Sequence, residues 1–178
     1  LLDNNTYNVD LSYKDQNSKI VSKSIISKDK VKKRQVNIFK SGIKILSGVV
    51  PGLEGVGFTI KLNSNVEKAL AQGYSYAEIW NGIDMYGNKV EVDSKRVQEA
   101  QKIAPTVSQI KTDKTGNAYT EMLPYGKYVV KETYTPNDYE TATDFTFSIT
   151  QDESEIKNNA QKTLRIVVNN EQLESYLK

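Results

Sequence analysis

The sequence contains no cysteine and no histidine among its 178 residues. Without these two side chains, thiol nucleophiles, Ser-His-Asp triads, disulfide bonds and most zinc sites are excluded. The chain is therefore poorly supplied for ordinary enzyme chemistry. We expect a protein that is not an enzyme and that needs no cofactor and no metal ion.

The sequence also lacks a charge excess and long apolar runs. It has 24 basic and 22 acidic residues, for a formal net charge of +2, and its lysines are scattered instead of gathered in a stripe. Nothing in this pattern indicates a nucleic-acid partner. No apolar run approaches the roughly 20 residues that a membrane helix requires, so no membrane partner is expected.

Short strand-like runs separated by turn residues make up most of the chain, among them "QVNIFK", "GVGFTIKL", "KYVVKE", "DFTFSIT" and "TLRIVVNN". Tyrosine and threonine, which suit half-buried pleated surfaces, are plentiful. Between about residues 63 and 104, "NVEKALAQGYSYAEIWNG" and "DSKRVQEAQKIA" instead have helix-forming composition and apolar residues three and four apart. The sequence predicts a mainly β protein, an antiparallel Ig-like or prealbumin-like β-sandwich with an inserted helical segment.

Three segments follow from this pattern. Residues 1–33 contain two strands and a basic linker, "KDKVKKR", and are too short for a core of their own. We interpret them as the tail strands of a preceding domain or as an extra hairpin. Residues 34–172 form the sandwich, and residues 173–178 lead into a following module.

One carboxylate stands in a strand that otherwise appears to be buried. In "KYVVKE", Tyr128, Val130 and Glu132 share parity, so a pleat that sends the first two side chains into a core sends Glu132 in with them. An unpaired buried carboxylate costs several kcal/mol. Glu132 therefore needs a partner or a chemical task.

Four phrases resemble, in order, those of the SpaA/CnaB-type prealbumin-like domains of Gram-positive surface adhesins and pilins. They are "QVNIFK", "LEGVGF", "GKYVVKETYTPNDY" and the closing strand "LRIVVNN". The chain departs from the usual phrases at Val56, where alanine is common, and at Asp138, where glycine is common. The helical insertion is also longer than in minimal members of the family.

The resemblance implies an intramolecular isopeptide bond between a strand lysine and a strand asparagine, assisted by a nearby carboxyl group. The parity of "QVNIFK" places Lys40 in the inward row, and the parity of "TLRIVVNN" does the same for Asn170. Choosing Asn169 instead would turn Arg165 into the core, although a strand bulge could reverse that choice. Glu132 is the expected catalyst of this single turnover.

The expected chemistry depends on dehydration of the site. Burial disfavours the ammonium form and lowers the pKa of Lys40, which then becomes a nucleophile. The same surroundings favour a protonated Glu132, which can hydrogen-bond to the asparagine carbonyl oxygen and shuttle protons while ammonia leaves. Correct orientation of the two groups can by itself lower the activation free energy by about 7–11 kcal/mol.

The resemblance implies a structural stalk or backbone module of a cell-wall-anchored adhesin or pilin, extracellular and on the cell surface. Its partners would be neighbouring modules of the same protein and a host matrix protein or glycan. The alternative is a host-ligand binding module that uses the helical insertion without a crosslink. A hydrolase with the paired carboxylates Glu132 and Glu140 is disfavoured, because no other acid-base group supports them.

Two further motifs have a structural and a functional interpretation. Tyr74, Tyr76 and Trp80 could form an aromatic ligand platform, but Tyr76 and Trp80 lie four apart, and such a helical spacing favours packing of the insertion onto the sandwich. The segment "DKTGN" lacks the alternating acidic ligands of a calcium loop and predicts a hairpin turn.

Overall fold

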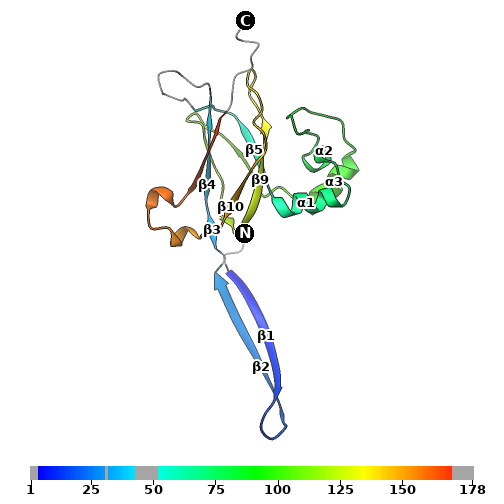
Figure 1. Ribbon diagram of the computed structural model, residues 1–178, viewed down its shortest axis with the longest axis vertical. Coiled ribbons are helices and arrows are strands. Elements are labelled where there is room, and N and C mark those ends of the chain that lie inside the picture. The colour runs from blue at the N-terminus through cyan, green and yellow to red at the C-terminus, as the bar shows by residue number, and fades with distance from the viewer. Residues whose placement is uncertain (1–3, 31, 43–51, 170–178) are drawn as a thin grey trace. The chain divides into compact units, whose positions relative to one another are not determined.

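The computed structural model describes residues 4–30, 32–42 and 52–169 (Figure 1). The chain divides into two compact units, Leu1–Lys32 and Lys33–Lys178. In the first unit, β1 (Asn4–Lys14) pairs antiparallel with β2 (Ile20–Lys30). The Asp15 carboxylate accepts hydrogen bonds from the backbone N–H groups of Asn17 and Lys19, and this Asx-type geometry closes the turn.

The second unit contains two main sheets. The larger has the strand order β10 (Phe145–Ile149), β9 (Gly126–Tyr134), β5 (Gly57–Leu62), β6 (Ser108–Lys111). The smaller has the order β11 (Leu164–Asn169), β4 (Val36–Ser41), β7 (Asn117–Tyr119). A short pair joins β3 (Lys33–Arg34) to β8 (Leu123–Pro124). Among the described strands of this unit, all pairings are antiparallel except that of β11 with β4, which is parallel.

A hydrophobic core lies between the inner faces of the two sheets. It contains alternate residues of the strands, including Val36 and Ile38 of β4, Phe58 of β5 and Val130 of β9. Their burial removes apolar surface from water, which is the main stabilising term for such a sandwich. The predicted mainly β sandwich with a helical insertion is confirmed. Because strand side chains alternate, the rows that bury these residues also carry Lys40 and Glu132 inward.

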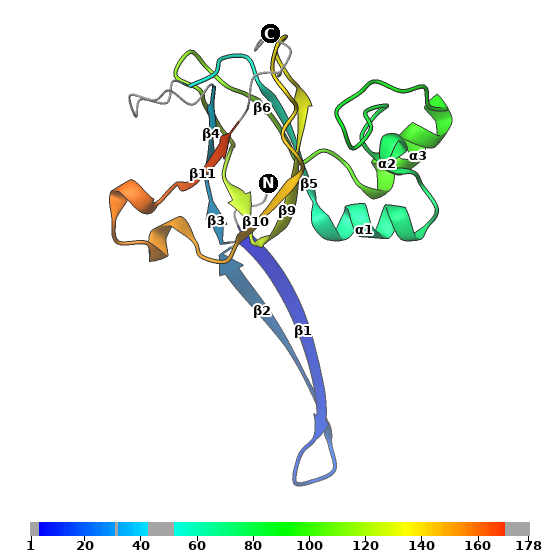
Figure 2. The same ribbon diagram turned by 45° about the horizontal axis from the view of Figure 1, so that its top comes forward.

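The outer face of the larger sheet is covered by α1 (Asn63–Ala71), α2 (Tyr76–Ile79) and α3 (Ser94–Ile103). Figures 1 and 2 show the three helices grouped beside β5 and β9, away from β4 and β11. A second apolar cluster joins the insertion to Val129 of β9; its members in the insertion are Val66, Ala69, Ile79, Trp80, Ala100 and Ala104. The central strands are therefore buried on both faces. None of the helices in the described ranges is both long and apolar enough to span a membrane.

The ends of α2 follow from its sequence. Ser75 caps the N-terminus, and Glu78 completes a capping box by accepting a hydrogen bond from the Ser75 backbone N–H. After Trp80, Asn81 and Gly82 adopt φ angles of 55° and 84°, the left-handed region that asparagine and glycine tolerate best. This turn ends the helix and leaves the Trp80 side chain buried beside the sheet.

The two remaining motifs occupy structural positions. Tyr76 packs against Trp80 with ring centroids 6.1 Å apart, and its hydroxyl contacts Asp144 and Lys131 of the sandwich, so it fastens the insertion as predicted. The "DKTGN" segment is a turn in which the Asp113 carboxylate accepts backbone hydrogen bonds. Backbone hydrogen bonds from the Asp113 N–H to the Asn117 carbonyl oxygen and from the Gly116 N–H to the Asp113 carbonyl oxygen close it, so the predicted tight turn is present. The strands that it connects, β6 and β7, lie in different sheets. After β10, two short 3-10 turns, η1 (Glu153–Glu155) and η2 (Asn159–Gln161), lead to β11.

Candidate crosslinking site

Lys40 of β4 and Glu132 of β9 meet inside the sandwich. The Lys40 Nζ lies 2.9 Å from the Glu132 Oε1, and the two side chains are 0% and 1% exposed. The strands that carry them belong to different sheets, so the contact bridges the core. The partner that the sequence analysis required for Glu132 is therefore an amine.

Neighbouring groups orient the Glu132 carboxyl group. Its Oε2 accepts a hydrogen bond from the Thr135 hydroxyl at 2.6 Å and a longer one from the Ala142 backbone N–H at 3.3 Å. Its Oε1 accepts no well-directed hydrogen bond from the described residues and faces Lys40 as an ion pair. One oxygen is thus fixed by the protein, and the other is turned toward the amine.

The end of the last strand lies beside the same amine. In the parallel pairing of β11 with β4, Val168 is opposite Lys40 and Asn169 is opposite Ser41. The Lys40 Nζ donates a hydrogen bond to the backbone carbonyl oxygen of Asn169 at 3.1 Å. The structure thus brings the amine, the carboxyl group and the C-terminal end of β11 together.

The two candidate asparagines differ in what the structure says of them. The side-chain Oδ1 of Asn169 accepts a hydrogen bond from the Ser41 hydroxyl at 2.7 Å. Asn169 belongs to the exposed row of β11 with Arg165 and Val167, whereas Val168 is buried. Asn170 lies outside the described residues.

Burial changes the acidity of the amine. Removal from water lowers the pKa of Lys40, and this effect outweighs the opposing attraction of the Glu132 carboxylate, which raises it. A buried ion pair of this kind recovers only part of the cost of dehydrating its two charges. The neutral form of the amine, which is the nucleophile, is therefore more populated at Lys40 than at an ordinary surface lysine.

Thr135 and Ser41 were not identified by the sequence analysis. Thr135 lies just beyond the end of β9, three residues after Glu132, so strand parity gave no signal for its contact with the carboxyl group. Ser41 could have been found only from the register of β11 against β4. In the described part of the chain, no group of three or more acidic side chains is arranged to hold a metal ion.

Comparisons with known proteins identify the family of the chain. Residues 48–164 match the family model "SpaA: Prealbumin-like fold domain". Because the match covers more than half of the sequence, the chain belongs to this family. No curated protein sequence matches it.

Solved structures of pilins are similar to the chain. A mutant of the shaft pilin SpaA from Lactobacillus rhamnosus GG is 19% identical, with a TM-score of 0.50, covering 80% of this chain and 52% of that one. The minor pilin GBS52 of Streptococcus agalactiae is 15% identical, with a TM-score of 0.46, covering 86% and 53%. This chain therefore spans about half the length of these pilins, and at 19% identity the likeness to the shaft pilin concerns the fold alone.

Proposed function

We propose that the chain is a structural stalk or shaft module of a cell-wall-anchored adhesin or pilin of a Gram-positive bacterium, stabilised by a self-generated amide bond between Lys40 and Asn170. The observation that carries the proposal is the buried contact of Lys40 with Glu132 beside the end of β11. Family membership supports the module's class, and the named pilins of similar fold support its structural role.

The bond forms without a cofactor. The free amine of Lys40 attacks the side-chain carbonyl carbon of Asn170, and the bond from that carbon to the amide nitrogen breaks. Glu132 hydrogen-bonds to the carbonyl oxygen and carries a proton from the attacking nitrogen to the leaving one, so it is unchanged at the end. The products are one secondary amide and one ammonia. Burial and orientation replace external activation.

Asn169 is the alternative acceptor. The alternation observed along β11, with Val168 buried and its neighbours exposed, supports Asn170, which shares the parity of Val168. The engagement of the Asn169 Oδ1 by Ser41 supports the same choice. The tests below distinguish the two residues.

The module organisation is part of the proposal. Residues 34–172 form the SpaA/CnaB-like sandwich with its insertion at about 63–104, residues 1–33 belong to a preceding domain or an extra hairpin, and residues 173–178 lead into a following module. The division of the chain between residues 32 and 33 supports the first boundary. The partners are neighbouring modules of the same extracellular protein.

The intact mass of the purified chain tests the crosslink. We expect a mass lower than the sequence value by one ammonia, and fragmentation of the linked peptide should place the bond at Asn170. The deficit should disappear in Lys40→Ala, Glu132→Ala and Asn170→Ala. Lys131→Met, which removes another buried lysine, is the matched control and should keep the deficit. A wild-type mass equal to the sequence value would refute the bond. Loss of the deficit in Asn169→Ala but not in Asn170→Ala would assign the bond to Asn169 instead.

A further inference from the structure

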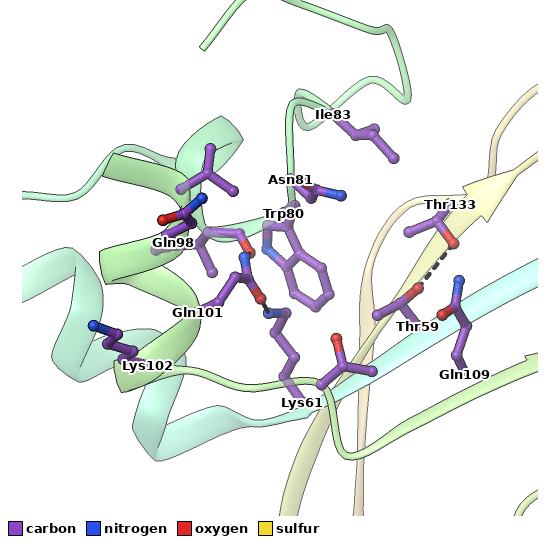
Figure 3. A pocket seen from close by; sticks show the side chains of 13 residues that line it. Thr59, Lys61, Trp80, Asn81, Ile83, Gln98, Gln101, Lys102, Gln109 and Thr133 are labelled. Carbon is purple, nitrogen blue, oxygen red and sulfur yellow. Dashed lines mark hydrogen bonds between the residues drawn. The ribbon is translucent and has the colours of Figure 1, made fainter. Parts of the chain in front are cut away.

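A cavity of about 570 Å³ lies between the helical insertion and the outer face of the larger sheet. Figure 3 shows Gln98, Gln101 and Lys102 of α3 on one side and Thr59, Thr133 and Gln109 of the sheet on the other, with Trp80 between them. The volume falls within the range of about 300–1,000 Å³ that is typical of small-molecule sites. The crosslinking site on the inner face makes no use of this space.

Lys61 of β5 lines the cavity as a buried cation. Its side chain is only 1% exposed, and its Nζ donates hydrogen bonds to the Gln101 Oε1 at 2.6 Å and to the Ala104 carbonyl oxygen at 2.5 Å. The Nζ also lies 5.3 Å from the centre of the Trp80 ring. An ammonium group has three N–H donors, so one remains without a hydrogen-bond acceptor within the described ranges.

The missing counter-charge sets Lys61 apart. Lys40 faces Glu132, and Lys131 lies 3.5 Å from Asp144, but Lys61 contacts no carboxylate in the part of the chain that the structure describes. Burial lowers its pKa to about 8, so the side chain remains largely charged at pH 7. A buried charge is normally paired, and an unpaired one beside a cavity indicates that the ligand supplies the anion.

The other cavity-lining side chains suit a ligand with many hydroxyl groups. Four exposed polar residues make no side-chain hydrogen bond to the described residues: Asn81, Gln98, Thr106 and Gln109. Amides and hydroxyls both donate and accept, which matches a sugar hydroxyl, and the indole ring adds an apolar surface. A ligand with a carboxylate but no hydroxyl groups would leave these four side chains without hydrogen-bond partners.

We propose that the cavity binds a saccharide that bears a carboxylate, with the carboxylate on Lys61 and the hydroxyls on the free amide and hydroxyl groups around it. The site is independent of the proposed crosslink, because it lies on the opposite face of the sheet. It would give a structural module a recognition function of its own.

Trp80 provides the readout, since it is the sole tryptophan of the sequence. The full chain is titrated with glucuronate, galacturonate and N-acetylneuraminate while tryptophan fluorescence is recorded. Glucose, which lacks the carboxylate, and acetate, which lacks the hydroxyls, are the controls. We expect a saturable change with at least one acid sugar and at least tenfold weaker binding of both controls. No response to any acid sugar, or equal binding of either control, overturns the proposal.

Variants locate the site. Lys61→Met should weaken binding of the acid sugar at least tenfold, whereas Lys127→Met, which removes an exposed lysine of β9 outside the cavity lining, should bind as the wild type does. Gln109→Ala alters an exposed residue and does not threaten folding; it should weaken binding at least threefold, with Gln151→Ala as its exposed control. Unchanged binding in a folded Lys61→Met variant or in Gln109→Ala overturns the assignment. Intact mass recorded on the same samples reports separately on the crosslink.

Discussion

At the residue scale, the described structure buries three lysines, each with different neighbours. Lys40 has Glu132, Lys131 has Asp144 and the Tyr76 hydroxyl, and Lys61 has only neutral acceptors. Burial is the largest cause of a lowered pKa at all three. These ammonium groups therefore cost stability, and the cost is largest where no carboxylate offsets it.

Lys61 gives a prediction for the pH dependence of stability. Its pKa of about 8 in the folded chain lies below the ordinary value of 10.5, so the unfolded chain binds more protons between these two values. The unfolding free energy of the wild type, relative to Lys61→Met, should rise by about 3 kcal/mol from pH 7.5 to 10.5. Urea unfolding of both proteins at several pH values measures this difference, in which the contributions of other groups cancel. A difference that does not change with pH would contradict the buried, unpaired ammonium.

At the scale of elements, β9 contributes to two cores, whereas β5 contributes to the sandwich core alone. Their inner rows belong to the sandwich core, and Val129 on the outer face of β9 belongs to the cluster beneath the helices. The insertion is thus held by its own apolar contacts, together with the contacts of Tyr76 to Lys131 and Asp144. The helical insertion should therefore be able to unfold separately from the sandwich.

Ile79→Ala tests this separation. Ile79 is completely buried in the cluster beneath the helices, and such a truncation costs about 2–5 kcal/mol. We expect faster amide hydrogen exchange in α2 and α3 and little change in β4 and β11. Val90→Ala, at a position that is 41% exposed, is the control and should change stability by less than about 0.5 kcal/mol. An equal loss of protection in both sheets would show that the molecule has a single cooperative core.

At the scale of the whole molecule, the proposed bond joins the first long strand of the sandwich to its last strand. These strands, β4 and β11, are neighbours in the smaller sheet although they lie far apart in sequence. A link from Lys40 to Asn170 would close a loop of about 130 residues, for which the chain-entropy model gives on the order of 5 kcal/mol. Force applied along the chain would pass through this bond, so it would not pull apart the strands that lie between Lys40 and Asn170 in the sequence.

Chain topology offers a direct test of this closure. A cleavage site for a specific protease, inserted between the exposed residues Lys157 and Asn158, would lie inside the loop. After cleavage and denaturation, the two fragments of the otherwise wild-type chain should stay joined, whereas those of the Lys40→Met chain should separate. A denaturing gel or intact mass gives the answer. Separation of the wild-type fragments would exclude any covalent link between β4 and the segment after β11.

The strand pattern could be predicted from the sequence because side chains alternate along a pleated strand with a period of two. Alternation in "QVNIFK" and "KYVVKE" predicted that Lys40 and Glu132 point inward, and both are buried. The same period does not show what covers the outer face of β5 and β9. Lys61 and Lys131 have the parity of solvent-facing residues, and only the helices that cover them decide that they are buried.

The sequence by itself determined the mainly β sandwich, its helical insertion and the inward rows of the strands, because these depend on local periodicity and turn chemistry. Only the tertiary structure decided that the Lys40 amine lies 2.9 Å from Glu132, that β11 lies parallel beside β4, and that a cavity with an unpaired Lys61 remains under the helices. Such features depend on contacts between residues distant in the chain. Local pattern does not specify them, because burial and pairing are set by what packs against each face.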